Sequence, residues 1–303
     1  MDWTRLEPLL TSVPLWSVAG ALFVSMALAA FITLRVRQAR ERKRPLSKEE
    51  LEENRSAEGY IVSAVLGLLA LLLGFTFSLA VDRFDARRLL VRQEATTIGA
   101  AYLRAQLLDE PDRARTSRLI AQYVDTRVAL GKDRGARRAE LLAVNDRLAD
   151  DIWAATAAAL DNIKCYDWSS SYLESIAAVL ELDAARKSAR MARVPAQVFI
   201  VLFVYMVATA AVLGHVVRGN GVRIAAGVLL ALLTLTLVMI IDIDGPIGGA
   251  VFENQRPMEL LQRRIASYPP GMFQKWRSAS PARCPSAAVA APSPAEGFAP
   301  PKT

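Results

Sequence analysis

The stretch from Glu58 to Leu108 constrains the fold of this chain more than any other. Its first part, Tyr60 to Val81, is apolar and long enough to cross a hydrocarbon core of roughly 30 Å at a rise of about 1.5 Å per residue. No turn residue separates this run from the charged sequence DRFDARRLL, Asp82 to Leu90, and a helical pattern continues to Leu108. The stretch therefore predicts one helix that spans a bilayer and continues into a water-exposed part of the protein.

Three further apolar runs are long enough to span a bilayer in the same way. They extend from about Leu15 to Leu34, Ala196 to Val217 and Ile224 to Ile241. The basic segment Arg35 to Arg44 follows the first run, whereas the positive charge of a signal peptide precedes its apolar region, so we expect an uncleaved anchor. The tight turn Gly219 to Gly221 joins the last two runs into a hairpin. A hydrophobic content of 53% supports the membrane class that these runs predict.

Between the second and third runs, residues 82–194 carry apolar side chains at helical spacing on otherwise charged segments. In the first of these segments, Val91, Ala95, Ile98 and Tyr102 form one stripe. The four predicted helices end at about Leu108, Gly131, Lys164 and Arg193. No two-residue alternation typical of a strand appears, so we predict a helical bundle of roughly 110 residues, which is large enough for a small core of its own.

The predicted fold is an all-α polytopic membrane protein with four transmembrane helices and a helical bundle inserted between helices two and three. We divide the chain into a first transmembrane helix with a charged connector (1–59), the second transmembrane helix (60–81), the helical soluble domain (82–194), the transmembrane hairpin of helices three and four (195–241), a post-membrane segment (242–277) and a disordered tail rich in Pro and Ala (278–303).

The net charge of +7 is spread along the chain rather than gathered in one domain. A nucleic-acid-binding protein would concentrate its basic residues on one face of a domain. We therefore expect the lipid bilayer as a partner, with the basic residues near anionic headgroups, and no nucleic acid.

No arrangement of catalytic residues is recognisable in the sequence. The one histidine, His215, lies at the end of the third run, where an interfacial position explains it. Metalloprotease, phosphate-loop and hydrolase motifs are absent. Cys165 and Cys284 lie in different segments without a CxxC pair, so we expect free thiols and neither a disulfide framework nor a metal site. The chain is thus not expected to be an enzyme, and we expect no catalytic residue, no metal and no cofactor.

The most informative charged residues follow the second and fourth runs, and with four spans these two exits lie on the same side of the membrane. The residues are Asp82, Arg83, Asp85, Arg87, Arg88, Asp242 and Asp244. Because the helix macrodipole disfavours carboxylates at a helix C-terminus, Asp242 and Asp244 need partners, and the arginines after the second run are available. Two interpretations stay open: interfacial ion pairs that fix helix packing, or the charged mouth of a pore or a cation site.

Two segments at these exits resemble a known family. LLGFTFSLAVDRFDARRLL, from Leu72 to Leu90, is similar to the second-helix signature of the bestrophins. IDIDGPIGGAVFENQRPMELL, from Ile241 to Leu261, resembles the segment that follows their fourth helix. The order of elements is also shared: two spans, a helical soluble stretch, a two-span hairpin and then this motif. The chain resembles most closely a bacterial family of bestrophin-like membrane proteins.

This resemblance implies a pentameric anion channel whose second helix lines a hydrophobic neck. Phe75 would match the aromatic residue of that neck, with Leu71 and Gly67 one and two turns before it. The implied partners are further copies of the chain and chloride or other small anions. The calcium site of animal bestrophins uses a run of acidic residues, and Asp242 and Asp244 are too few to match it.

The resemblance places the protein in the cytoplasmic (inner) membrane, with residues 82–194 in the cytoplasm. The basic residues between Arg35 and Arg44 argue for the opposite orientation, because short basic connectors favour the cytoplasmic side. Long domains weaken that rule, so we follow the resemblance.

Two functional hypotheses remain. The first is an oligomeric bestrophin-like anion channel with helix two lining the pore. The alternative is a non-conducting membrane scaffold or sensor whose helical domain binds a partner.

Overall fold

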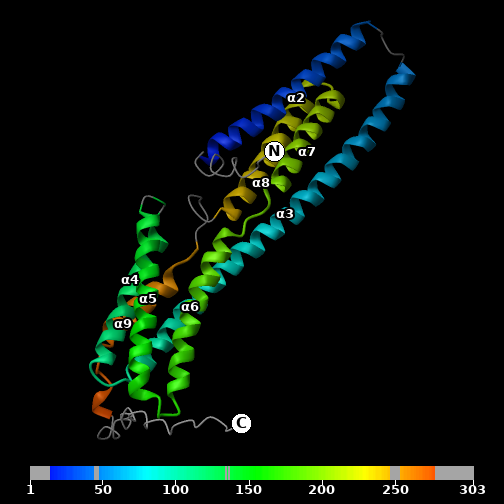
Figure 1. Ribbon diagram of the computed structural model, residues 1–303. Helices are drawn as coiled ribbons and strands as arrows, with labels where there is room; N and C mark the ends of the chain where they lie inside the picture. The colour runs from blue at the N-terminus through cyan, green and yellow to red at the C-terminus, as the bar shows by residue number, and fades with distance from the viewer. Residues whose placement is uncertain (1–13, 44–47, 134, 136, 246–252, 277–303) are drawn as a thin grey trace, which may run out of the picture. The chain divides into compact units, whose positions relative to one another are not determined.

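The computed structural model describes residues 14–43, 48–133, 135, 137–245 and 253–276, and every regular element in these ranges is a helix (Figure 1). The helices are α2 (Leu15–Lys43), α3 (Lys48–Ala105), α4 (Asp112–Lys132), α5 (Arg138–Ile163), α6 (Ser169–Met191), α7 (Ala196–Val216), α8 (Asn220–Asp244), α9 (Arg256–Ser267) and the short 3-10 helix η2 (Gln274–Trp276). Helices long and apolar enough to span a membrane are α2, α3, α8 and the stretch Ser169–Val216, which ends in α7. The predicted all-α chain with four spans and a helical insertion is confirmed.

Helix α3 is continuous from Lys48 to Ala105, as the absence of a turn residue after Val81 predicts. Helix α2 extends to Lys43 and α3 begins at Lys48, so the charged sequence on either side of residues 44–47 is helical. Three basic residues occupy the last turn of α2, where positive charge complements the helix dipole.

The described residues form two compact units. The first contains α2, α3 up to Val91, the end of α6 from Ala184, α7 and α8. The second contains the remainder of α3, α4, α5, α6 up to Asp183, and α9. The post-membrane helix α9 thus belongs to the second unit.

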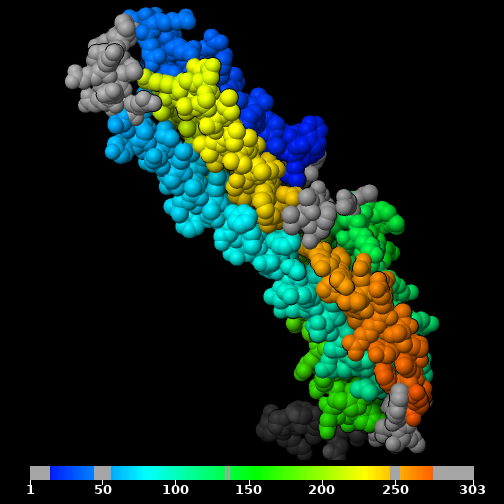
Figure 2. Space-filling view, turned by 180° about the vertical axis from the view of Figure 1, so that it is seen from behind, coloured from blue at the N-terminus to red at the C-terminus, as the bar shows by residue number. Residues whose placement is uncertain are grey.

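In the first unit, α2 packs against α7 and α8 (Figure 1), and Figure 2 shows α8, in yellow, between α2, in blue, and α3, in cyan, on that face. The helices approach closely at Gly214 of α7, where an added Cβ would overlap the carbonyl oxygen of Ala30 and the hydroxyl of Thr33 on α2. Small residues at such crossings let two membrane helices come together. The core of this unit includes Met26, Leu69, Leu202, Met206 and Ile240.

Arg37 of α2 caps the C-terminal end of α7. Buried Arg37 of α2 donates through Nη1 to the carbonyl oxygens of His215 and Val217, the latter at 3.0 Å. Because the last carbonyl groups of a helix have no partner within it, the guanidinium group satisfies two of them and complements the dipole. Glu41 lies near both Arg37, at 3.5 Å, and Arg218, at 3.6 Å.

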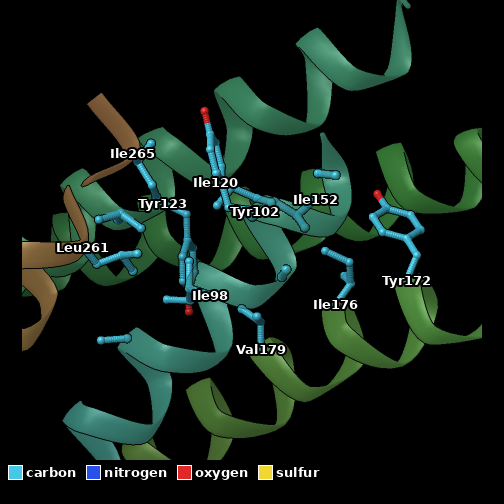
Figure 3. Close-up of a cluster of buried hydrophobic side chains, with 14 of the residues drawn as sticks. Ile98, Tyr102, Ile120, Tyr123, Ile152, Tyr172, Ile176, Val179, Leu261 and Ile265 are labelled. Atoms are coloured by element: carbon cyan, nitrogen blue, oxygen red, sulfur yellow. The ribbon is translucent and has the colours of Figure 1, made fainter. Parts of the chain in front are cut away.

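The core of the second unit draws on five helices, and Figure 3 shows its centre. Of the predicted stripe on α3, Ala95, Ile98 and Tyr102 are buried in this core. Helix α9 adds Met258, Leu261 and Ile265, whose spacing places them on one helical face. The other large contributors are Ile120 and Tyr123 of α4, Ile152 of α5, and Tyr172, Ile176 and Val179 of α6.

The predicted ends of the helices between the second and third spans lie within three residues of the observed ones. The observed ends are Ala105 for α3, Lys132 for α4, Ile163 for α5 and Met191 for α6. Cys165, in the turn between α5 and α6, is disulfide-bonded, so the expectation of a free thiol at this position is wrong.

Candidate functional site

The apolar part of α3 has one packed face and one exposed face. Leu69 and Leu73 are buried in the core of the first unit. Gly67, Leu71 and Phe75 lie on the other face, and Leu71 and Phe75 are 51% and 67% exposed. No other part of the described chain lies within 4 Å of a Cβ built at Gly67. The three residues that the sequence singles out therefore share a face that the described residues leave uncovered.

The exposed face becomes polar toward the end of the apolar run. Ser78, Asp82 and Asp85 are exposed and follow Phe75 at steps of three and four residues, which keeps them on the same helical stripe. Gly74, one residue before Phe75, is also exposed, with open space around it. One stripe of α3 thus combines apolar, small and acidic residues.

Arg87 points into the protein, unlike the acidic residues of the stripe. Its side chain is 3% exposed, and its Nη2 donates to the carbonyl oxygen of Ile243 at 2.8 Å. Ile243 belongs to the last turn of α8, so Arg87 satisfies a terminal carbonyl group where the dipole favours positive charge. Its Nε lies 3.4 Å from Oε1 of Glu253.

Three arginines surround the carboxylate of Glu253: Arg87, Arg186 and Arg190. We call these three residues the arginine cluster. Arg190 Nη2 donates to Oε2 of Glu253 at 3.1 Å, and Arg186 Nη2 lies 4.0 Å from the same oxygen. Arg87 comes from α3 and the other two from α6. A single buried carboxylate therefore links two helices of the first unit to the segment that follows α8.

Asp244 interacts electrostatically with Arg87 and also accepts hydrogen bonds from a backbone amide. Both of its carboxylate oxygens accept from the backbone N–H of Val194, at 3.1 and 3.2 Å. Val194 lies two residues before α7, so this contact fixes the entry of the third span against the end of the fourth. Asp242 is also buried and has an interaction partner.

The predicted charged residues thus separate into two groups. Arg87, Asp242 and Asp244 are buried at the end of the first unit, where Arg87 lies within electrostatic range of Asp244. The residues Asp82, Asp85 and Arg88 are exposed, and Arg83 is half-buried.

The sequence reasoning missed a buried ionic network in the second unit. Arg127 of α4 lies 2.7 Å from Glu94 of α3 and 2.9 Å from Asp183 of α6. Asn145 of α5 donates to the same Asp183 oxygen at 3.1 Å. Burial lowers the pKa of Arg127, but Glu94, Tyr123 and Asp183 outweigh that effect and raise the pKa above its ordinary value. The network joins three helices through buried charges and a fourth, α5, through the Asn145 amide.

The positions of these charged residues in the sequence could have predicted that they are buried and paired. Glu94 lies four residues before Ile98, and Arg127 lies four residues after Tyr123, so both charges fall within the apolar stripes of their helices. A charged residue inside an apolar stripe is buried and needs an opposite charge. No comparable local signal identifies Glu253, because its partners lie far away in the sequence.

Comparisons with known proteins agree with this architecture. A family model described as a bestrophin-like domain matches residues 19–251. The crystal structure of a bacterial bestrophin homologue from Klebsiella pneumoniae, determined with a tryptophan-to-alanine mutation, matches with a TM-score of 0.56 and 14% sequence identity, over 86% of this chain and 97% of that one. At that identity the likeness concerns the fold. No curated protein matches the chain.

Proposed function

The chain belongs to the bestrophin-like family, and on that premise we propose that it assembles into an oligomeric anion channel of the inner membrane whose pore is lined by α3. Channel function is what the family resemblance implies. The residues proposed to face the pore are Gly67, Leu71 and Phe75. Those proposed for its charged mouth are Asp82 and Asp85 together with Arg83 and Arg88, whose positive charge offsets the two carboxylates at the entrance of an anion path.

The exposed stripe of α3 is the observation that supports this proposal most strongly. A membrane helix face that its own chain leaves uncovered meets either lipid or another copy of the chain. Ser78 and Asp82 continue the stripe of Phe75, and an ionised side chain facing hydrocarbon is costly. Gly74, beside the pore-facing residues, leaves open space that a helix of a neighbouring copy can fill, because small residues favour close helix packing in membranes. Copies arranged around this stripe would enclose a path with water at its charged end.

Phe75 is proposed as the narrowest point of that path. It has the largest side chain on the stripe between Gly67 and Ser78, and it is 67% exposed in the single chain. Hydrophobic constrictions restrict ion flow because they lose their water, so a smaller residue at this position should let more ions pass.

The test is halide flux through liposomes that contain the purified protein. We expect wild-type protein to pass chloride or bromide, and Phe75→Ala to pass it several times faster at equal protein content. Phe77→Ala is the matched control, because Phe77 is an aromatic residue of the same helix off the stripe of Phe75, and it should leave the flux unchanged. Equal flux for the two variants would exclude Phe75 as the constriction.

The absence of flux from well-folded wild-type protein would favour the second hypothesis, a non-conducting scaffold or sensor. In that case a partner protein of fixed stoichiometry should co-purify with the chain.

A further inference from the structure

We propose that the arginine cluster is a binding site for a small inorganic anion, and that the Glu253 carboxylate competes with that anion for the same guanidinium groups. The site lies at the buried end of the first unit, away from the exposed stripe of α3. The proposal does not require the chain to conduct ions.

The unsatisfied donors of Arg87 are the first observation. Its Nη1 and Nε are buried, and no atom of the described residues accepts a hydrogen bond from either. The Glu253 oxygen 3.4 Å from Nε provides an ionic contact without a hydrogen bond. A buried N–H group without an acceptor is costly, and an unseen water or ion is the usual explanation. Arg87 therefore offers donors for one more acceptor.

The sharing of one carboxylate is the second observation. Arg87, Arg186 and Arg190 all lie within 4.0 Å of Glu253. The positive charge of Arg83 also acts electrostatically on Arg87. Asp244 contributes negative charge, but both of its oxygens already accept from the Val194 amide. An anion that replaces or supplements the shared Glu253 carboxylate would complete the hydrogen bonds of the Arg87 guanidinium group and remain close to the other two arginines.

The burial of the cluster points to a small ligand. Arg87 and Arg186 are 3% and 5% exposed, and the Glu253 side chain is 8% exposed. A halide ion needs little space and accepts N–H donors from any direction, so we expect chloride or bromide to bind. The Glu253 carboxylate then competes with the halide for the same guanidinium groups. Neutralising this carboxylate should therefore strengthen halide binding.

Thermal unfolding of the purified full-length protein in detergent tests the proposal. We use chloride as the probe against gluconate at equal ionic strength, which removes general salt effects. Wild-type protein should melt at a higher temperature in chloride, and the shift should grow with the logarithm of the chloride concentration. Glu253→Gln should enlarge the shift between chloride and gluconate at least twofold.

Arg87→Gln should abolish this shift, whereas Arg88→Gln, which removes the same charge from an exposed neighbour on α3, should leave it unchanged. If Arg87→Gln does not fold, Arg190→Gln should reduce the shift and Arg190→Lys should retain part of it. Identical melting in chloride and gluconate, for both wild type and Glu253→Gln, would overturn the proposal. If Arg88→Gln and Arg87→Gln reduced the chloride-dependent shift in melting temperature equally, that result would also overturn the proposal. These measurements do not depend on ion flux, so their outcome tests the anion site independently of the channel proposal.

Discussion

Arg127 shows how a single residue can determine whether several helices stay together. Its guanidinium group contacts Glu94 and Asp183, and all three side chains are almost completely buried. Burying charges costs free energy that only close, well-hydrogen-bonded pairing offsets. The network is therefore most sensitive to the loss of its one cation.

Arg127→Ala should lower the free energy of unfolding by about 3–5 kcal/mol, because it leaves Glu94 and Asp183 buried without their counter-charge. Arg118→Ala is the control, since Arg118 is exposed on the same helix, and should change the stability by no more than about 0.5 kcal/mol. Thermal unfolding of the detergent-purified chain measures both. Indistinguishable melting temperatures for the two variants would show that the network does not hold the unit together.

At the scale of the element, the spanning helices differ in how they meet their neighbours. Helix α7 approaches α2 so closely at Gly214 that no Cβ fits, whereas Gly227 of α8 and Gly67 of α3 have open space around them. Glycine in a spanning helix thus has two different roles in this chain: an internal crossing in α7 and an uncovered face in α3 and α8.

Gly214→Ala should destabilise the protein, because the added methyl group would overlap the Ala30 carbonyl oxygen and force α2 and α7 apart, at a cost of about 1–3 kcal/mol. Gly227→Ala should leave the stability unchanged or raise it by up to about 1 kcal/mol, since alanine is the better helix former and nothing lies nearby. Melting temperatures in detergent test this pair. Equal destabilisation by both substitutions would contradict the assigned α2–α7 crossing.

The elements themselves could be predicted because their signals are local. Apolar length identifies the spans, and three-to-four-residue spacing identifies the soluble helices and the buried Ile98 and Tyr102. The arginine cluster could not be predicted, because Arg87 and Glu253 are brought together only by the folded chain. The same holds for the hydrogen bonds that Asp244 accepts, because the backbone amide that donates them carries no sequence signal.

At the scale of the whole molecule, a single chain cannot enclose a path along α3. The stripe of Gly67, Leu71 and Phe75 is exposed in one chain, so only further copies could surround it. Soluble and membrane oligomers of identical chains close most often by rotational symmetry, which brings the same face of every copy to a common axis. The proposed function therefore requires an assembly with α3 at its axis.

The mass of the purified protein in detergent, measured with the bound detergent subtracted, tests that claim most directly. The proposal predicts a single species of about five times 33.1 kDa, the pentamer that the family resemblance implies. A stable monomer or dimer would contradict it, because one or two copies of α3 cannot surround a shared path.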